Sequence, residues 1–259
     1  MPPSLHNGRM AHGSALRIRV WHVSLSAAVS LTVLIVLCLG LVPSGCGKPS
    51  ASGADAGALL AEAVAPMEAL SSFHFTYTVI RPADAPAPPG TEIAGIEGDV
   101  SLEGLMEAVV DVNQSGVPLQ FKFVATNDVH YVQNPASQEW QSVPASLSPV
   151  GDLNLSAGAV LILERVQQPT EAGAEKVGDT ACVKVVGKIA AQDIADLVSA
   201  ADAQELLDCT IWLGKDDHLV RRIQTVGAAV SGEDKRLKRL IELSAFNEAV
   251  DIQLPPSTG

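Results

Sequence analysis

The sequence predicts an α+β fold, in which an antiparallel sheet or barrel is combined with a small number of helices. Short segments in which apolar and polar residues alternate recur at regular spacing between turn residues, which is typical of antiparallel strands. Two longer segments, 54–71 and 153–168, instead carry apolar residues at helical spacing. Residues 46–259 have the length of one domain, which is enough to bury a core and a cavity.

The segment 54–71 is predicted as the first helix. Asp55 can cap its N-terminus, and Pro66 should kink it or mark a turn. The apolar residues that fall on one face of this helix are Leu59, Leu60, Val64, Met67 and Leu70.

Strands are predicted over most of the first half of the chain. In the segment 73–80, aromatic and apolar residues at odd positions alternate with His and Thr, which indicates a half-buried strand. The next run, 82–90, is rich in proline and is predicted as a loop. Further strands are predicted at 93–102, 105–112, 118–125, 129–132 and 139–143.

The helical period appears in the second half of the chain, at 153–168, and a short helix is predicted at 191–200. A turn at 215–218 joins two strands into a hairpin. The acidic pair Glu233-Asp234 and the basic residues within 235–239 are expected to be solvated. The strands predicted here are 180–189, 207–213, 219–227 and 237–245, with 250–254 as a further candidate.

The N-terminal segment has the parts of a secretory signal. Three arginines precede a charge-free apolar stretch from Val23 to Val42, and small residues follow it. A cysteine directly after Pro43-Ser44-Gly45 resembles that of a bacterial lipoprotein signal, although Pro43 stands where Leu, Val or Ile is usual. In such signals the cysteine thiol receives a diacylglyceryl group. We therefore predict a signal peptide at 1–45, lipidation of Cys46, and a flexible linker at 46–54.

An uncleaved transmembrane anchor is the alternative, since twenty apolar residues can span a bilayer. Both interpretations keep the positive flank in the cytoplasm and export the rest of the chain. The lipid anchor is favoured because Cys46 ends the apolar stretch and a linker follows at once. We therefore expect the protein on the extracytoplasmic face of the cell membrane, held there by lipid chains.

Charge excludes one class of function. The formal net charge is −12, and residues 1–45 contain arginines but no acidic residue, so the exported part is more acidic still. Such a surface repels phosphates, which argues against binding to nucleic acid. It also disfavours peripheral binding to anionic lipid, so the membrane link must come from the anchor.

Two cysteines, Cys182 and Cys209, remain in the exported domain. An even pair outside the cytoplasm indicates a disulfide, and two buried free thiols are the alternative. No metal site is predicted, because the histidines have no partner at metal-ligand spacing and there is no C-x-x-C motif. Nucleophile-elbow, P-loop and dinucleotide motifs are also absent from the sequence, so we expect neither an enzyme nor a cofactor.

Surplus apolar surface on the strands is the most suggestive remaining feature. An ordinary core explains any single residue, but a sheet curved around helices can leave an apolar cavity, and such cavities bind hydrophobic ligands. The residues expected to line such a cavity are Phe73, Phe75, Tyr77, Val79, Val100, Leu102, Leu119, Phe121, Phe123, Leu155, Ala159, Val160, Ile162, Leu163, Ile211 and Leu213.

An ordered set of short motifs, each weak alone, follows the proposed lipidated cysteine. The first is Met67-Glu68-Ala69-Leu70-Ser71-Ser72-Phe73-His74-Phe75, and the others are Ile96-Glu97-Gly98-Asp99-Val100, Asp128-Val129-His130-Tyr131-Val132 with Glu139-Trp140, Val186-Gly187-Lys188-Ile189, the hairpin from Thr210 to Ile223, and Pro255-Pro256. In this order they resemble the LppX/LprA/LprF/LprG family of mycobacterial-type lipoproteins.

The resemblance implies a curved antiparallel half-barrel over 55–256, with helices on its concave face and an apolar cavity between them for lipid acyl chains. It further implies a non-catalytic carrier that moves acylated lipid or glycolipid outward from the cytoplasmic membrane, together with an export transporter. A structural or sensory lipoprotein of the cell envelope, which acts through protein partners, is the alternative. The Cys182 and Cys209 pair departs from the mycobacterial members.

Overall fold

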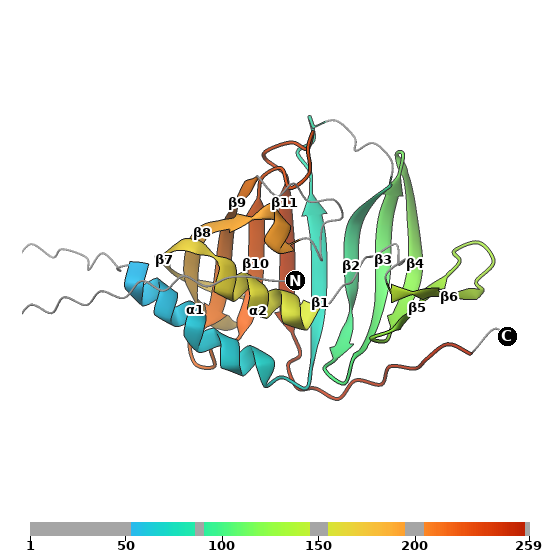
Figure 1. Cartoon of the computed structure of the whole chain (residues 1–259), viewed down its shortest axis with the longest axis horizontal. Helices are drawn as coiled ribbons and strands as arrows, with labels where there is room; N and C mark the ends of the chain where they lie inside the picture. The colour runs from blue at the N-terminus through green and yellow to red at the C-terminus, as the bar shows by residue number, and fades with distance from the viewer. Residues whose placement is uncertain (1–52, 86–90, 146–154, 195–204, 257–259) are drawn as a thin grey trace, which may run out of the picture. The chain divides into compact units, whose positions relative to one another are not determined.

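The computed structural model describes residues 53–85, 91–145, 155–194 and 205–256. In this part of the chain, one antiparallel sheet of 11 strands has the order β6-β5-β4-β3-β2-β1-β11-β10-β9-β8-β7 (Figure 1). The two edge strands, β6 and β7, do not pair with each other, so the sheet is open. The predicted antiparallel sheet is therefore confirmed as an open sheet rather than a closed barrel.

The first six strands pair in chain order. They are β1 (Ser72–Ile80), β2 (Thr91–Ser101), β3 (Leu105–Gln114), β4 (Val117–Ala125), β5 (Val129–Gln133) and β6 (Trp140–Pro144). The turn between β3 and β4 consists of Ser115 and Gly116, with φ of 52° and 89°. Two consecutive residues with positive φ form the kind of tight turn that suits the twist of a hairpin. Each of these strands overlaps a strand predicted from the sequence, and the ends differ by at most two residues.

The other five strands also pair in chain order, and they meet the first six in the middle of the sheet. They are β7 (Gln167–Val177), β8 (Thr180–Ala190), β9 (Leu206–Gly214), β10 (Val220–Val226) and β11 (Lys238–Ser244). Here β11 pairs with β1, for example Phe75 opposite Leu243. The hairpin between β9 and β10 is closed by hydrogen bonds between Gly214 and Leu219 and between His218 and Gly214, both at 2.9 Å.

Among the described residues, three helical segments accompany the sheet. Helix α1 (Gly53–Glu68) contains Pro66 near its end and packs on α2 (Leu155–Arg165) and β7, while α2 also contacts β8 and the short 3₁₀ segment η2 (Ala191–Ile194). Figure 1 shows α1 and α2 in front of the part of the sheet that contains β8–β10. Within the described residues, no helix is both long and apolar enough to cross a bilayer.

Three sequence-based predictions need correction. The helix predicted to reach residue 168 ends at Arg165, and Gln167 already begins β7, a strand that alternation did not reveal because most of its side chains are exposed. The segment 250–254 forms no strand, since β11 is already paired on both sides with β1 and β10. The helix predicted at 191–200 is the short η2 as far as Ile194, and the rest of it lies outside the described residues.

One face of the sheet carries apolar side chains across nearly its whole width. Directly opposed residues in antiparallel strands point to the same face, and the register pairs Tyr77 with Ile96 and Ile241, and Val110 with Phe121. We call this face, which also carries Phe75 and Ile211, the inner face. Most of these residues belong to one continuous apolar cluster with α1 and α2.

A glycine brings two strands together on the inner face. Gly98 lies between Phe75 of β1 and Ala108 of β3 in the register. A side chain there would place its Cβ 2.2 Å from the Glu107 carbonyl oxygen and 2.7 Å from Ala108. Glycine is therefore required for this close approach of backbones.

Candidate functional site

The strand residues that we expected to line a cavity share the inner face. The β1 residues Phe73, Phe75 and Tyr77 are buried, and the paired registers place the other strands' candidates on the same side. Leu102, just after β2, packs against the edge of the same apolar cluster. The strand candidates that meet on this face are Phe73, Phe75, Tyr77, Val79, Val100, Leu119, Phe121, Phe123, Ile211 and Leu213.

Helix α2 supplies the facing surface. Ala159, Ile162 and Leu163 are buried in the same cluster, and Val160 is partly buried against it. The spacing of these residues places them on adjoining turns of one helix. Leu155 begins α2, and its side chain lies outside the described ones.

Coverage of the inner face is uneven. Phe73 and Phe75 on β1 are fully buried, whereas Leu119 and Phe121 on β4 and Val132 on β5 are only partly buried. In Figure 1 neither α1 nor α2 extends in front of β2–β6. The inner face therefore has a buried part next to the helices and a more open apolar part on β4 and β5.

A small cavity lies between the sheet and the segments α2 and η2. Its volume is about 10 Å³, which is space for roughly one water molecule. At this point, the described residues of α2, η2 and the sheet leave room for no more than about one water molecule. The residues around the cavity are Tyr77, Ile162, Ile194, Ile223, Thr225, Arg239 and Ile241.

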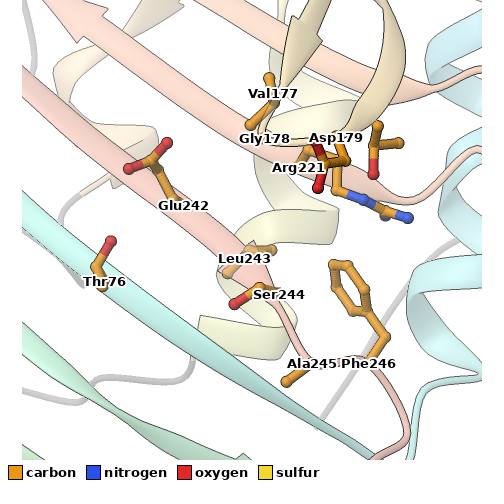
Figure 2. Close-up of a pocket in the computed structure, with 11 residues that line it drawn as sticks. Thr76, Val177, Gly178, Asp179, Arg221, Glu242, Leu243, Ser244, Ala245 and Phe246 are labelled. Atoms are coloured by element: carbon orange, nitrogen blue, oxygen red, sulfur yellow. The ribbon is translucent and has the colours of Figure 1, made fainter.

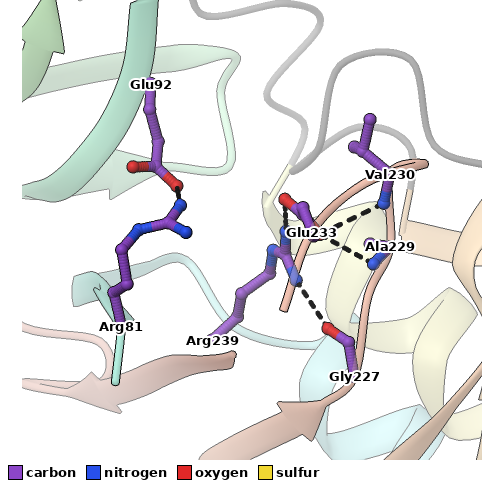
Figure 3. Close-up of polar contacts among 7 residues, drawn as sticks. All are labelled: Arg81, Glu92, Gly227, Ala229, Val230, Glu233 and Arg239. Carbon is purple, nitrogen blue, oxygen red and sulfur yellow. Dashed lines mark hydrogen bonds and ion pairs between the residues drawn. The ribbon is translucent and has the colours of Figure 1, made fainter. Parts of the chain in front are cut away.

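A buried ion pair borders this cavity. The Arg239 guanidinium donates hydrogen bonds to Glu233 and, at 3.4 Å, to the Gly227 carbonyl (Figure 3). Glu233 also accepts from the backbone amides of Ala229 at 2.8 Å and Val230 at 3.1 Å. The Arg239 side chain is only 6 % exposed and that of Glu233 17 %. The expectation that both would be solvated is therefore wrong.

The reason lies in the period of β11. Side chains alternate between faces along a strand, so Arg239 shares the inner face with Ile241 and Leu243, while Lys238 is exposed. The sequence contained this signal, because Arg239 precedes the two inward apolar residues at a spacing of two. The run of basic residues within 235–239 nevertheless suggested a solvated segment.

Two further polar groups lie near this ion pair. Burial raises the pKa of the Tyr77 phenol to about 12, against a smaller lowering effect of the Arg239 charge. Arg81, just after β1, pairs with Glu92 of β2, and both side chains are mostly buried (Figure 3). Positive and negative charges therefore occur here in compensated pairs.

The predicted disulfide is not formed. Cys182 and Cys209 are both free and buried. The register places Cys209 opposite Gly187, five positions along β8 from Cys182, which is about 17 Å at the usual strand rise. Cys209 also lies on the inner face with Ile211, while Cys182 lies on the opposite face with Lys184. A bridge requires Cα atoms within about 7 Å.

A larger hollow of about 490 Å³ lies on the outer face (Figure 2). Its lining includes Thr76, Glu242, Asp179 and Arg221, so it is mixed in polarity. The Arg221 guanidinium stacks 4.5 Å from the centre of the Phe246 ring. Arg221 pairs with Asp217 and Glu242 with Arg222, and the hollow has neither the apolar lining nor the enclosure of a lipid cavity.

The proposed lipid site Cys46 and the apolar stretch before it lie outside the described residues. Within the described ranges, no group of three or more His, Cys, Asp or Glu side chains is arranged to hold a metal ion. What the described site offers chemically is therefore an apolar surface with one compact polar cluster.

Comparison with known protein families shows to which family the chain belongs. The profile of the LppX_LprAFG lipoprotein family matches residues 55–252. The chain belongs to this family. The match spans α1 to the segment after β11, and the resemblance seen in the sequence motifs is thus confirmed.

Solved structures of LppX_LprAFG lipoproteins share the fold. LprF from Mycobacterium bovis is 21 % identical, with a TM-score of 0.59 over 80 % of this chain and 100 % of that one. LppX from Mycobacterium tuberculosis is 20 % identical, with a TM-score of 0.52 over 76 % of this chain and 98 % of that one. Comparison with curated protein sequences finds no match. The large, open antiparallel sheet with helices is therefore the fold of this family.

Proposed function

We propose that this LppX_LprAFG lipoprotein is a non-catalytic carrier. It binds the acyl chains of a lipid or glycolipid against the inner face and moves the lipid outward from the cytoplasmic membrane. The lipid chains on Cys46 hold the carrier at the extracytoplasmic face, where it receives its cargo from an export transporter. Membership of the lipoprotein family supports the anchor and the class of ligand.

The observation that carries this proposal is the uneven cover of the inner face. The apolar cluster runs from β8 and β9 through β1 to β4, yet Leu119 and Phe121 remain partly exposed at its far end. Burying a methylene group gains about 0.8 kcal/mol. An acyl chain laid along β4 and β5 would cover this apolar surface and remove its own methylenes from water.

The narrow space beside α2 sets a condition on binding. A cavity of about 10 Å³ cannot hold an acyl chain. An acyl chain that enters this cavity therefore has to part α2 from the sheet. Ile162 and Ile194 form the helical side of that space, so these two residues would exchange their contact with the sheet for contact with the chain.

A pair of substitutions on neighbouring positions of β4 tests the proposal. Phe121→Glu places a charge on the inner face, whereas Lys122→Glu makes a larger change of charge at an exposed position on the outer face. We expect the full-length wild type, purified from membranes in detergent, to carry lipid that native mass spectrometry detects. Phe121→Glu should lose this lipid, because burying an unpaired carboxylate against acyl chains is unfavourable, and Lys122→Glu should keep it.

Thermal unfolding of the same samples gives the control for folding. Because Phe121 is only partly buried, both variants should remain folded. Wild-type protein that carries no lipid and takes none from lipid-doped micelles would exclude the carrier. It would favour a structural or sensory lipoprotein that acts through protein partners.

A further inference from the structure

Three hydroxyl or guanidinium groups lie together within the otherwise apolar inner face. Thr225 of β10 is directly opposite Arg239 of β11, and Tyr77 of β1 is opposite the neighbouring Ile241. Their exposed fractions are 4 %, 5 % and 4 % respectively. All three border the cavity beside α2.

Two of these groups have buried donors without a partner among the described residues. They are Thr225 Oγ1 and Arg239 Nε. Burying a donor without an acceptor is unfavourable, so such groups call for an explanation. Both atoms belong to directly opposed residues on one face, so one acceptor in the adjoining cavity can satisfy both.

The rest of the Arg239 side chain is held in place. Its terminal nitrogens donate to Glu233 and to the Gly227 carbonyl, and Glu233 is fixed by two backbone amides (Figure 3). The charge of Arg239 is therefore already compensated. What remains is a preorganised donor that favours an uncharged acceptor over a carboxylate or phosphate, because a second anion would repel Glu233.

We propose that this cluster, consisting of Tyr77, Thr225 and Arg239, binds the carbonyl oxygen of an ester-linked acyl chain. The inference rests on the proposed lipid carrier and names the chemistry that it selects. The remaining wall is aliphatic, formed by Ile162, Ile194 and Ile223 among others, and suits the methylenes that flank an acyl carbonyl. Acyl esters are thus preferred over hydrocarbons, ether lipids and ionised fatty acids of the same length.

A competition between two lipids tests this selectivity. The probes are dipalmitoyl phosphatidylcholine and its di-O-hexadecyl analogue, which share chain length and head group and differ only in the two carbonyls. Full-length protein is held in micelles doped with equal amounts of both, and native mass spectrometry measures the ratio retained. We expect the wild type to prefer the ester lipid by about tenfold, the effect of one hydrogen bond of typical net strength.

Two variants remove single hydroxyl groups. Thr225→Val and Tyr77→Phe should each lower the ester preference several-fold and leave the amount of bound ether lipid unchanged. Thr78→Val is the matched control, since Thr78 is exposed on the outer face of β1. It should change neither quantity. Thermal unfolding establishes that each variant is folded, and two independent deletions keep the test decisive if one destabilises the protein.

The outcomes separate the two proposals. Equal binding of ester and ether lipid by the wild type would overturn the carbonyl site while supporting a carrier. The same would follow if Thr225→Val and Tyr77→Phe lowered the binding of both lipids equally. Binding of neither lipid by the wild type would overturn the carrier and with it the carbonyl site.

Discussion

The buried pair between Arg239 and Glu233 makes a sharp prediction about stability. Glu233→Gln leaves the Arg239 side chain, only 6 % exposed, without its carboxylate. Breaking such a pair by removing one partner costs about 3–5 kcal/mol. Because the Glu233 side chain is partly exposed to solvent, we expect a loss at the lower end of this range, about 3 kcal/mol. For a domain of this length, such a loss lowers the melting temperature by about 10 °C.

Two further variants test whether the loss of stability comes from leaving the Arg239 cation buried without a partner. Arg239→Met leaves Glu233 with the amides of Ala229 and Val230, so the loss should be smaller, about 1 kcal/mol. Asp216→Asn makes the same kind of change at an exposed acid in the turn between β9 and β10, and should barely alter the melting temperature.

Circular dichroism during thermal unfolding measures all three at neutral pH. If Glu233→Gln melted within 2 °C of Asp216→Asn, the reasoning that Arg239 is a buried cation in need of its partner would be refuted.

Three more predictions follow from single side chains. Cys46→Ala should abolish labelling by a radioactive fatty acid and leave unprocessed precursor, and label that persists would contradict the lipoprotein anchor. Titration of the unfolded, unreduced exported protein should find Cys182 and Cys209 both as free thiols. Cys209 should be unreactive while the protein is folded, because burial raises the pKa of its thiol to about 12, and should react once the protein unfolds. If the two thiols became reactive only after chemical reduction, the disulfide would be supported instead. The phenol of Tyr77 has a pKa near 10 in the unfolded protein and about 12 in the folded protein, so the wild type should lose stability as the pH rises from about 10 to 12. Tyr77→Phe should remove that part of the loss. Identical profiles of stability against pH for the two proteins would argue against a buried phenol.

Strands with one buried face were predictable from the sequence. In β1 the odd positions Phe73, Phe75 and Tyr77 were expected on one side and are buried together. The edge strand β7 could not be found in this way, because at the edge most of its side chains meet solvent and no alternation develops. Conversely, Val250, Ile252 and Leu254 alternate, but no free strand edge lies beside β11 for them to pair with.

The candidate site was predictable in its apolar part and not in its polar part. A face can be read from alternation within one strand, whereas the distance between Cys182 and Cys209 depends on how β8 and β9 are aligned. A shift of one residue in register changes which side chains share a face. The contact between Thr225 and Arg239 likewise requires the pairing of β10 with β11, which the spacing of residues along the chain does not fix.

The position of β1 beside β11 has a consequence for the order in which the protein can fold. All other strand pairs join neighbours in the chain, but His74 pairs with Ser244. Pairings between distant residues form slowly, because a long loop must close first. A chain that emerges N-terminus first can therefore pair β1–β6 early, yet β1 keeps an unpaired edge until the last strand is available. Unpaired edges promote aggregation, so truncation before Lys238 would leave two such edges, on β1 and on β10, in the middle of the molecule.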